Sequence, residues 1–233
     1  MSDTKTYDFQ AGEVLLIDKP LEWTSFDVVK KIRGQLRIKK IGHAGTLDPL
    51  ATGLLILCTG KMTKQINNYQ GMPKEYTGEF HLGCTTPSYD LETAIENEVD
   101  ISHLTEEAVY EAVNLFLGEI QQIPPAHSAV KVDGKRAYKS AREGKAVKID
   151  PRTVTIYEFD ITSIQFPKVT FRVKCSKGTY IRTLANDFGK ALGVGAHLSA
   201  LRRTAIGDFR VDEAKSIEEM VDIIQAWKRT QQA

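Results

Sequence analysis

The sequence predicts an α+β protein whose largely antiparallel sheet is flanked by helices. Strand-like and helix-like segments are mixed without a regular βαβ alternation. In addition, residues 169–175 alternate apolar and charged side chains, as in a strand with one buried face. With 233 residues, 42% of them hydrophobic, the chain is long enough to bury a core. Wholesale disorder and a disulfide scaffold are therefore excluded.

The predicted elements follow in chain order. Residues 13–17 form a first strand. Thr24 and Asp27 then have the spacing of a capping box, which opens a helix with an apolar stripe from Val28 to Leu36. Residues 42–53 are predicted to form a loop, because they are too rich in Gly and Pro for a regular element. Strands are also predicted at 54–58, 76–82, 154–164 and 169–175, and helices near 105–117, 183–192 and 217–227.

Nothing in the sequence indicates export or a membrane. The first dozen residues lack the apolar region of a secretory signal, and the longest aliphatic stretch, 54–57, is far too short to cross a bilayer. Cys58, Cys84 and Cys175 are widely spaced and odd in number, which is typical of thiols in a reducing compartment. We predict a cytoplasmic protein that does not associate with membranes.

The formal net charge of +1 conceals a segregation of charge along the chain. No Lys or Arg occurs between residues 75 and 130, whereas many acidic residues do. Basic residues cluster in 30–40, 131–148 and 168–182, and again at Arg202 and Arg203. If these segments converge, they form a positive face for a polyanion; otherwise they are ordinary solvated surface. Charge alone leaves both interpretations open.

The segment with the most chemical information runs from residue 41 to residue 53. Its glycines permit backbone angles and close approaches that a side chain would block. Pro49 favours an extended conformation at Asp48, so the carboxylate is presented on a stiff loop with basic residues on both sides. Asp48 is therefore a candidate nucleophile or base near a phosphate backbone. The commoner role of an Asp before Pro is to cap its own turn.

Other catalytic signatures are absent. The sequence has no Cys-x-x-Cys, no His-Glu-x-x-His, no Gly-x-Ser-x-Gly and no P-loop, and its five histidines are scattered. Gly42 and Gly45 match the Gly-x-x-Gly of KH domains, but the flanking helices of that motif are not evident. We expect no metal site and no cofactor.

Residues 42–53 resemble the active-site motif of the TruB family of tRNA pseudouridine synthases, with Asp48 in the catalytic position. The resemblance implies a pseudouridine-synthase-like fold and one catalytic domain over residues 1–233. It implies no PUA domain, which many members carry at the C-terminus, so the chain is expected to be a short or truncated form. Further segments resemble the family's other motifs in the same order: 15–20, 74–76, 123–144, 175–185 and 198–204.

The resemblance also implies an activity. A member of this family is an isomerase that converts the T-loop uridine (position 55) of tRNA to pseudouridine. The enzyme must flip the nucleotide out of the stack to reach it. Asp48 is implied to attack the sugar or the base, or to abstract a sugar proton, and the sequence does not choose between these roles. The implied partner is the T-arm stem-loop of tRNA, bound by a monomer with no obligate protein partner.

Two further residues receive roles near Asp48 from the resemblance. Arg182 is implied to pair with Asp48 and keep it ionised, although an arginine there is also suited to a phosphate contact. Tyr76 is implied to stack on the flipped uracil, although an aromatic residue in a strand is commonly part of the core.

The resemblance assigns the remaining site residues to the pocket and to the RNA. Tyr180 and Leu201 line the pocket, although Leu201 is equally suited to the core. His43 fills the space that the base vacates, whereas a lone His in a Gly-rich loop is usually structural. Lys64 contacts a phosphate, and Lys19 braces the catalytic loop.

Three other functions remain open on the sequence. The first is a guide-RNA-directed pseudouridine synthase of the dyskerin type, which carries a PUA domain and partner subunits. The second is a glycosidase-like hydrolase, which needs paired carboxylates, with Asp90 as a weak second to Asp48. The third is a non-catalytic RNA-binding or chaperone module, which has no need of Asp48.

Overall fold

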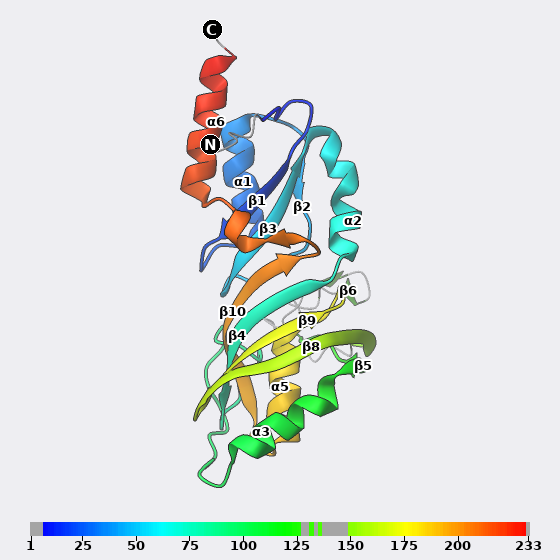
Figure 1. Cartoon of the computed structure of the whole chain (residues 1–233), viewed down its shortest axis with the longest axis vertical. Coiled ribbons are helices and arrows are strands. Elements are labelled where there is room, and N and C mark those ends of the chain that lie inside the picture. Colours follow the sequence, from blue (N-terminus) through cyan, green and yellow to red (C-terminus); the bar gives the residue numbers. More distant parts are fainter. Residues whose placement is uncertain (1–6, 127–130, 133–134, 137–148, 232–233) are drawn as a thin grey trace. The chain divides into compact units, whose positions relative to one another are not determined.

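The structure is a computed structural model that describes residues 7–126, 131–132, 135–136 and 149–231 (Figure 1). The chain divides into two compact units. The first unit comprises Met1–Lys74 with Arg202–Ala233, and the second comprises Glu75–Leu201. Helices accompany a largely antiparallel sheet, which confirms the predicted fold class. The single catalytic domain over residues 1–233 stays a prediction.

The sheet of the first unit is centred on one buried strand, β3. Strands β1 and β2 both pair with β3 in antiparallel fashion, and β3 also lies next to β10. Almost every residue of β3 is buried, which explains its continuous aliphatic sequence. The strands of this unit are β1 (Val14–Lys19), β2 (Ile41–His43), β3 (Ala51–Thr59), residues 202–206 of β10 (Ala196–Ile206) and β11 (Phe209–Arg210).

Two capped helices cover this unit's main core. Helix α1 (Ser25–Leu36) begins with the predicted capping box of Thr24 and Asp27, and α6 (Ile217–Thr230) begins with a second one. The two helices contact each other, and their apolar sides share a core with β1 and β3. The short helices of this unit are η1 (Gly60–Gln65), α2 (Ile66–Gly71) and η3 (Val211–Glu213).

In the second unit the strands follow the order β10–β4–β9–β8–β5. The predicted alternation in β9 is confirmed, because Val169, Phe171, Val173 and Cys175 are all buried. The strands are residues 75–82 of β4 (Lys74–Leu82), β5 (Gly118–Gln122), β8 (Arg152–Gln165), β9 (Lys168–Cys175) and residues 196–201 of β10. A separate hairpin consists of β6 (Lys131–Val132) and β7 (Lys135–Arg136).

Aromatic side chains fill the core of the second unit. The ring of Phe80 lies 4.1 Å from that of Phe171 and 5.4 Å from that of Phe188, between centroids. The helices are α3 (Glu106–Val113), η2 (Asn114–Phe116) and α5 (Ile181–Ala191). Helix α3 is shorter than the predicted 105–117, because its last turn tightens into η2 before Gly118, whose φ is +83°.

Two further features of the structure differ from what the sequence predicted. The loop predicted over 42–53 is shorter, because Gly42 and His43 pair with β3 and residues 51–53 belong to β3 itself. Strand β10 was not predicted at all. Arg202 and Arg203 interrupt its apolar pattern, and in the structure their side chains bond to Asp18 and to the Leu54 carbonyl.

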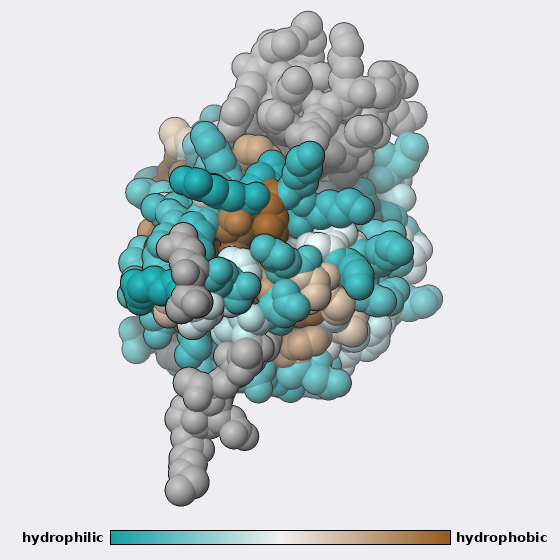
Figure 2. All heavy atoms as spheres, turned by 90° about the horizontal axis from the view of Figure 1, so that it is seen from above, coloured by the Kyte–Doolittle hydropathy of each residue, from teal (hydrophilic) through white to brown (hydrophobic). Residues whose placement is uncertain are grey.

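No helix in the described part of the chain is long and apolar enough to span a membrane. The face drawn in Figure 2 is mainly hydrophilic, with hydrophobic side chains exposed only in small areas between polar ones.

Candidate active site

Asp48 lies in the short loop between β2 and β3 in the first unit, and its side chain is half-buried. The loop backbone is held on both sides of this residue. The carbonyl of Asp48 accepts a hydrogen bond from the Ala51 N–H at 3.1 Å, and that of Pro49 accepts one from the Glu22 N–H at 2.9 Å. The loop therefore presents one carboxylate on a fixed backbone.

The first residue of α1 anchors the other arm of this loop. The hydroxyl of Ser25 accepts a hydrogen bond from the Leu47 N–H at 2.9 Å and lies 3.2 Å from the Leu47 carbonyl, to which it donates. Ser25, Leu47 and Ala44 are all buried. The first residue of α1 thus also fixes the chain immediately before Asp48.

Lys19, at the end of β1, is completely buried. Its ammonium donates to the carbonyls of Pro20 at 2.8 Å, Trp23 at 2.6 Å and, more weakly, Pro49 at 3.4 Å. Burial is the main cause that lowers the pKa of Lys19 to about 8; nearby Asp48 opposes this shift and Arg203 adds to it. Lys19 therefore ties β1 to the Asp48 loop and feels its charge.

Arg203 is a second buried cation next to the same loop. Its Nε donates to the Leu54 carbonyl at 2.7 Å and its Nη2 to the Gly45 carbonyl at 3.2 Å. These two carbonyls belong to opposite arms of the loop, so one guanidinium joins both. The sequence indicated only that Arg203 was basic.

His43 ends β2 with a half-buried ring. Its Nδ1 is buried without a hydrogen bond to any described residue, although the Gly45 backbone lies close enough to raise its pKa. Burial has the larger effect and lowers the pKa of His43, and the charge of Arg203 lowers it further. The ring is therefore uncharged near neutral pH.

Lys64 lies on η1 and is exposed, together with three other lysines of the first unit. The Gly60 N–H donates to the Lys40 carbonyl at 3.0 Å, which brings the chain before β2 next to the start of η1. We call this set the basic edge: Lys39, Lys40, Lys61 and Lys64.

In the second unit, Arg182 is buried in the first turn of α5. Its Nε lies 3.5 Å from Oδ2 of Asp90, and its Nη1 donates to the Ser88 carbonyl at 3.4 Å. Asp90 is itself buried, and its Oδ1 accepts from the Glu92 N–H at 3.0 Å. Asp90 was considered from the sequence only as a second carboxylate of a hydrolase, whereas the structure places it where it orients Arg182.

Tyr180 precedes α5 and is held by a side chain from β5. The Tyr180 N–H donates to Oε1 of Gln122 at 2.9 Å, and Nε2 of Gln122 donates to the Tyr180 carbonyl at 3.2 Å. The guanidinium of Arg152 lies 5.3 Å from the centroid of the Tyr180 ring. The start of α5 thus places Tyr180 and Arg182 close together in sequence and in space.

Tyr76 on β4 is 8% exposed, and Leu201 on β10 is half-buried. Both lie in the second unit with Tyr180 and Arg182, whereas His43, Asp48 and Lys64 lie in the first. The predicted pairing of Arg182 with Asp48 stays a prediction. Much of the predicted motif at 123–144 lies outside the described residues, as do the basic residues of 137–148.

Comparison with known proteins identifies the family. A model described as TruB family pseudouridylate synthase (N terminal domain) matches residues 33–181, and one for the tRNA pseudouridylate synthase B C-terminal domain matches residues 182–233. The chain belongs to the TruB family. Membership confirms the resemblance and the prediction of a pseudouridine synthase, an isomerase.

Similar proteins support this membership over the whole chain. A TruB-family relative from Flavobacterium johnsoniae, named tRNA pseudouridine synthase B, is 54% identical and covers 94% of this chain and 98% of its own. A relative of the same name from Phocaeicola vulgatus is 53% identical, covering 91% and 92%. Among solved structures, a Cbf5-Nop10-Gar1 complex contains a chain that is 34% identical with a TM-score of 0.75, covering 96% of this chain and 57% of that one.

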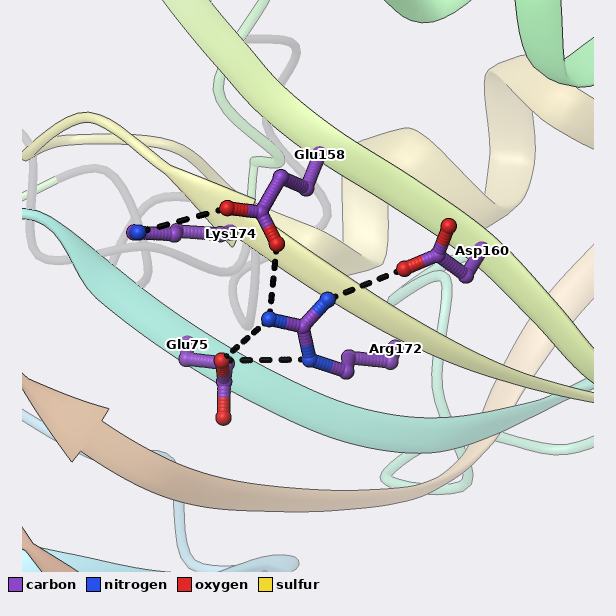
Figure 3. A network of polar contacts seen from close by, with 5 residues as sticks. All are labelled: Glu75, Glu158, Asp160, Arg172 and Lys174. Carbon is purple, nitrogen blue, oxygen red and sulfur yellow. Dashed lines mark hydrogen bonds and ion pairs between the residues drawn. The ribbon is translucent and has the colours of Figure 1, made fainter.

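Two basic residues that the sequence allowed either for a positive face or for ordinary solvated surface are paired with carboxylates. Arg172 on β9 forms ion pairs with Glu75 and Glu158, both at 2.7 Å, and with Asp160 at 2.9 Å (Figure 3). Lys174 joins the same network through Glu158 at 3.3 Å. Both cations lie on β9, and their carboxylate partners come from β4 and β8, so the charges of Arg172 and Lys174 are paired.

Among the residues that the structure describes, no group of three or more His, Cys, Asp and Glu side chains is arranged to hold a metal ion. Each unit has its own candidate group: the Asp48 loop with two buried cations in the first, and the start of α5 with Asp90 in the second.

Proposed function

We propose that this protein converts the T-loop uridine of tRNA (position 55) to pseudouridine, with Asp48 as the catalytic carboxylate and with the target nucleotide flipped out of its stack. The observation that carries the proposal is the Asp48 loop. A half-buried carboxylate stands there on a backbone to which buried Lys19, Ser25 and Arg203 donate hydrogen bonds. Such a preorganised group is suited to attack at one fixed position.

The chemistry needs an ionised carboxylate. In the isomerisation the bond between N1 and C1′ breaks, C5 is joined to C1′, the hydrogen on C5 leaves as a proton and N1 gains one. Asp48 attacks the sugar or the base, or takes a sugar proton, and each role requires a free electron pair on oxygen. The positive charge of Lys19, which interacts with Asp48, favours that ionised form.

The choice of tRNA as substrate rests on the relatives and on the basic edge. Relatives more than half identical to this chain are named tRNA pseudouridine synthase B. The basic edge provides exposed ammonium groups for RNA phosphates, with Lys64 as the contact predicted from the sequence. We assign the T-arm stem-loop as the part bound, by a monomer in the cytoplasm.

The second unit contributes the residues that we assign to holding the substrate. Tyr76 provides an aromatic face for the uracil, and Tyr180 and Leu201 provide apolar surface around it. Arg182 provides a guanidinium whose direction is restrained by Asp90 and the Ser88 carbonyl. In the first unit, His43 has an uncharged ring that can replace the flipped base by stacking.

Incubation of the full chain with an unmodified tRNA transcript, followed by mapping of pseudouridine, tests this function. We expect modification at the T-loop uridine alone and none in a transcript with cytidine there. Release of free uracil would indicate a hydrolase, and binding without modification would indicate an RNA-binding module. A need for added guide RNA would indicate a guide-directed enzyme. Each of these three results contradicts the proposal.

A further inference from the structure

The guanidinium of Arg203 is unusual in having carbonyls rather than a carboxylate as partners. The side chain is 1% exposed and, among the described residues, it forms no ion pair. It donates to Leu54 and Gly45, one on each arm of the Asp48 loop. A buried cation without a carboxylate is costly, so its retention calls for a role other than stability.

The backbone of the loop is shaped to admit this arginine. Gly53 has a φ of +102°, and a Cβ there would lie 2.3 Å from the Arg203 carbonyl oxygen and 2.8 Å from its nitrogen. Gly45 has a φ of +94°, and a Cβ there would lie 3.6 Å from Nη1 of Arg203. Gly53 therefore allows the backbone of β3 to approach the backbone of β10 closely at Arg203, whereas the Gly45 distance is an ordinary van der Waals contact and its φ alone favours glycine.

Arg203 also acts on the charges around the loop. Its positive charge lowers the pKa of Lys19, whereas the charge of Asp48 raises it. Lys19 therefore interacts with both groups within the first unit, and the negative charge of Asp48 opposes the effect of Arg203 on it.

We propose that Arg203 is a positioning residue for Asp48: it joins the two arms of the loop and, with Lys19, holds the carboxylate ionised and aimed. The proposal rests on the assignment of Asp48 as the catalytic carboxylate. Arg203 itself acts through the loop and is not assigned a contact with the substrate.

The neighbouring arginine provides a matched control. Arg202 points away from the loop carbonyls and forms a two-pronged pair with Asp18, with Nη1–Oδ1 at 3.0 Å and Nη2–Oδ2 at 2.6 Å. Its side chain is 40% exposed. Its Nη1 also lies 3.5 Å from the Thr52 hydroxyl. Substitution of Arg202 therefore removes one arginine from the same strand, with the same change in total charge, but leaves the bonds from Arg203 to Gly45 and Leu54 in place.

The experiment compares the full chain with Arg203→Met, Arg203→Lys and Arg202→Gln. We expect Arg203→Met to lower the single-turnover rate at saturating tRNA by about 100-fold, because small misplacements of a reacting group cost that much. Arg203→Lys keeps the positive charge but loses the planar guanidinium that bonds to both carbonyls at once. Its single-turnover rate should therefore fall by only about tenfold. The concentration of tRNA at half saturation should stay within about threefold in all variants.

Hydrogen exchange provides a readout that does not depend on activity. Amides in residues 44–54 should exchange at least about tenfold faster in Arg203→Met and Arg203→Lys, and at the native rate in Arg202→Gln. If Arg203→Met does not fold, Arg203→Lys still answers the question. Unchanged exchange in a folded Arg203 variant, or a loss of activity that lies wholly in tRNA binding, would overturn the proposal. An active Asp48→Asn variant would instead refute the proposed function. The exchange measurement would still show whether Arg203 holds the two arms of the loop together.

Discussion

Two groups of cations, one in each unit, have opposite kinds of partner. In the first unit, Lys19 and Arg203 are buried and donate to backbone carbonyls that border the Asp48 loop. In the second, Arg172 lies on a partly exposed sheet face and is surrounded by Glu75, Glu158 and Asp160 (Figure 3). The charges of Lys19 and Arg203 can therefore act on a carboxylate in the loop, whereas the charge of Arg172 is neutralised by its own ion pairs.

This difference shows that the partner of a charge, and not the charge itself, decides its role. Ion pairs on a solvated face are screened by salt and contribute little to stability. Buried cations bound to carbonyls are little screened, and they determine both the shape of a loop and the state of an acid within it. The predictions below compare the two arrangements in order of expected effect.

Asp48→Asn should reduce pseudouridine formation below detection. The amide keeps the shape of the side chain but has no ionised oxygen for attack or proton abstraction. Binding of tRNA should stay within a few-fold, because phosphates are not attracted to a carboxylate. Single-turnover assays and a filter-binding titration measure the two effects. A substantial rate in this variant would remove Asp48 from the mechanism.

Asp90→Asn should lower the single-turnover rate by about 10-fold to 100-fold. The substitution removes the buried carboxylate beside Arg182, so the guanidinium loses the partner that directs it. Lys174→Gln, which removes a member of the exposed network, is the control and should leave the rate unchanged. Equal rates for Asp90→Asn and the native chain would show that Arg182 needs no such restraint.

The rate should fall about fivefold as the pH rises from about 7 to about 9. Lys19 has a pKa of about 8, so it is charged below that pH and neutral above it. An ammonium has three hydrogens for its three carbonyls, whereas a neutral amine has two, and the long bond to Pro49 is the first to be lost.

The matched variant for this test is Lys19→Arg, because an arginine side chain stays charged from about pH 7 to about pH 9. Its pH–rate profile should lack the decline near pH 8 that the native chain shows. A decline of equal size in both proteins would assign it to another group.

The affinity for tRNA should fall linearly with salt on a logarithmic plot, and Lys64→Gln should flatten the slope by about 0.7 to 0.9. Lys64 is exposed on the basic edge, so its ammonium is accessible to a phosphate. In contrast, Lys174 is already paired with Glu158 at 3.3 Å, and Lys174→Gln should leave the slope as it is. Equal slopes for all three proteins would place the phosphate contacts elsewhere.

Local patterns in the sequence predicted most of the fold. The capping box at Thr24, the alternation in β9 and the aliphatic run of β3 each specify an element through contacts between near neighbours. The resemblance to the TruB family, now confirmed, pointed to the Asp48 loop. The roles assigned to the individual site residues stay predictions.

What the sequence did not predict depends on contacts between distant residues. Strand β10 contains two adjacent arginines, whose side chains bond to Asp18, Gly45 and Leu54, more than 140 positions away. The partner of Asp90, at the start of α5, is also remote in sequence. A buried charge in an otherwise apolar strand, such as Arg203, is the signal that would have directed attention to the loop.

The most direct test of the contrast is a side-by-side measurement of single-turnover pseudouridine formation by Arg203→Met and Arg172→Met at saturating tRNA. Both variants lose one arginine, but only the first loses a cation that joins the arms of the Asp48 loop. We predict a loss of about 100-fold for Arg203→Met and a change of less than about twofold for Arg172→Met. Similar rates for two folded variants would contradict the account.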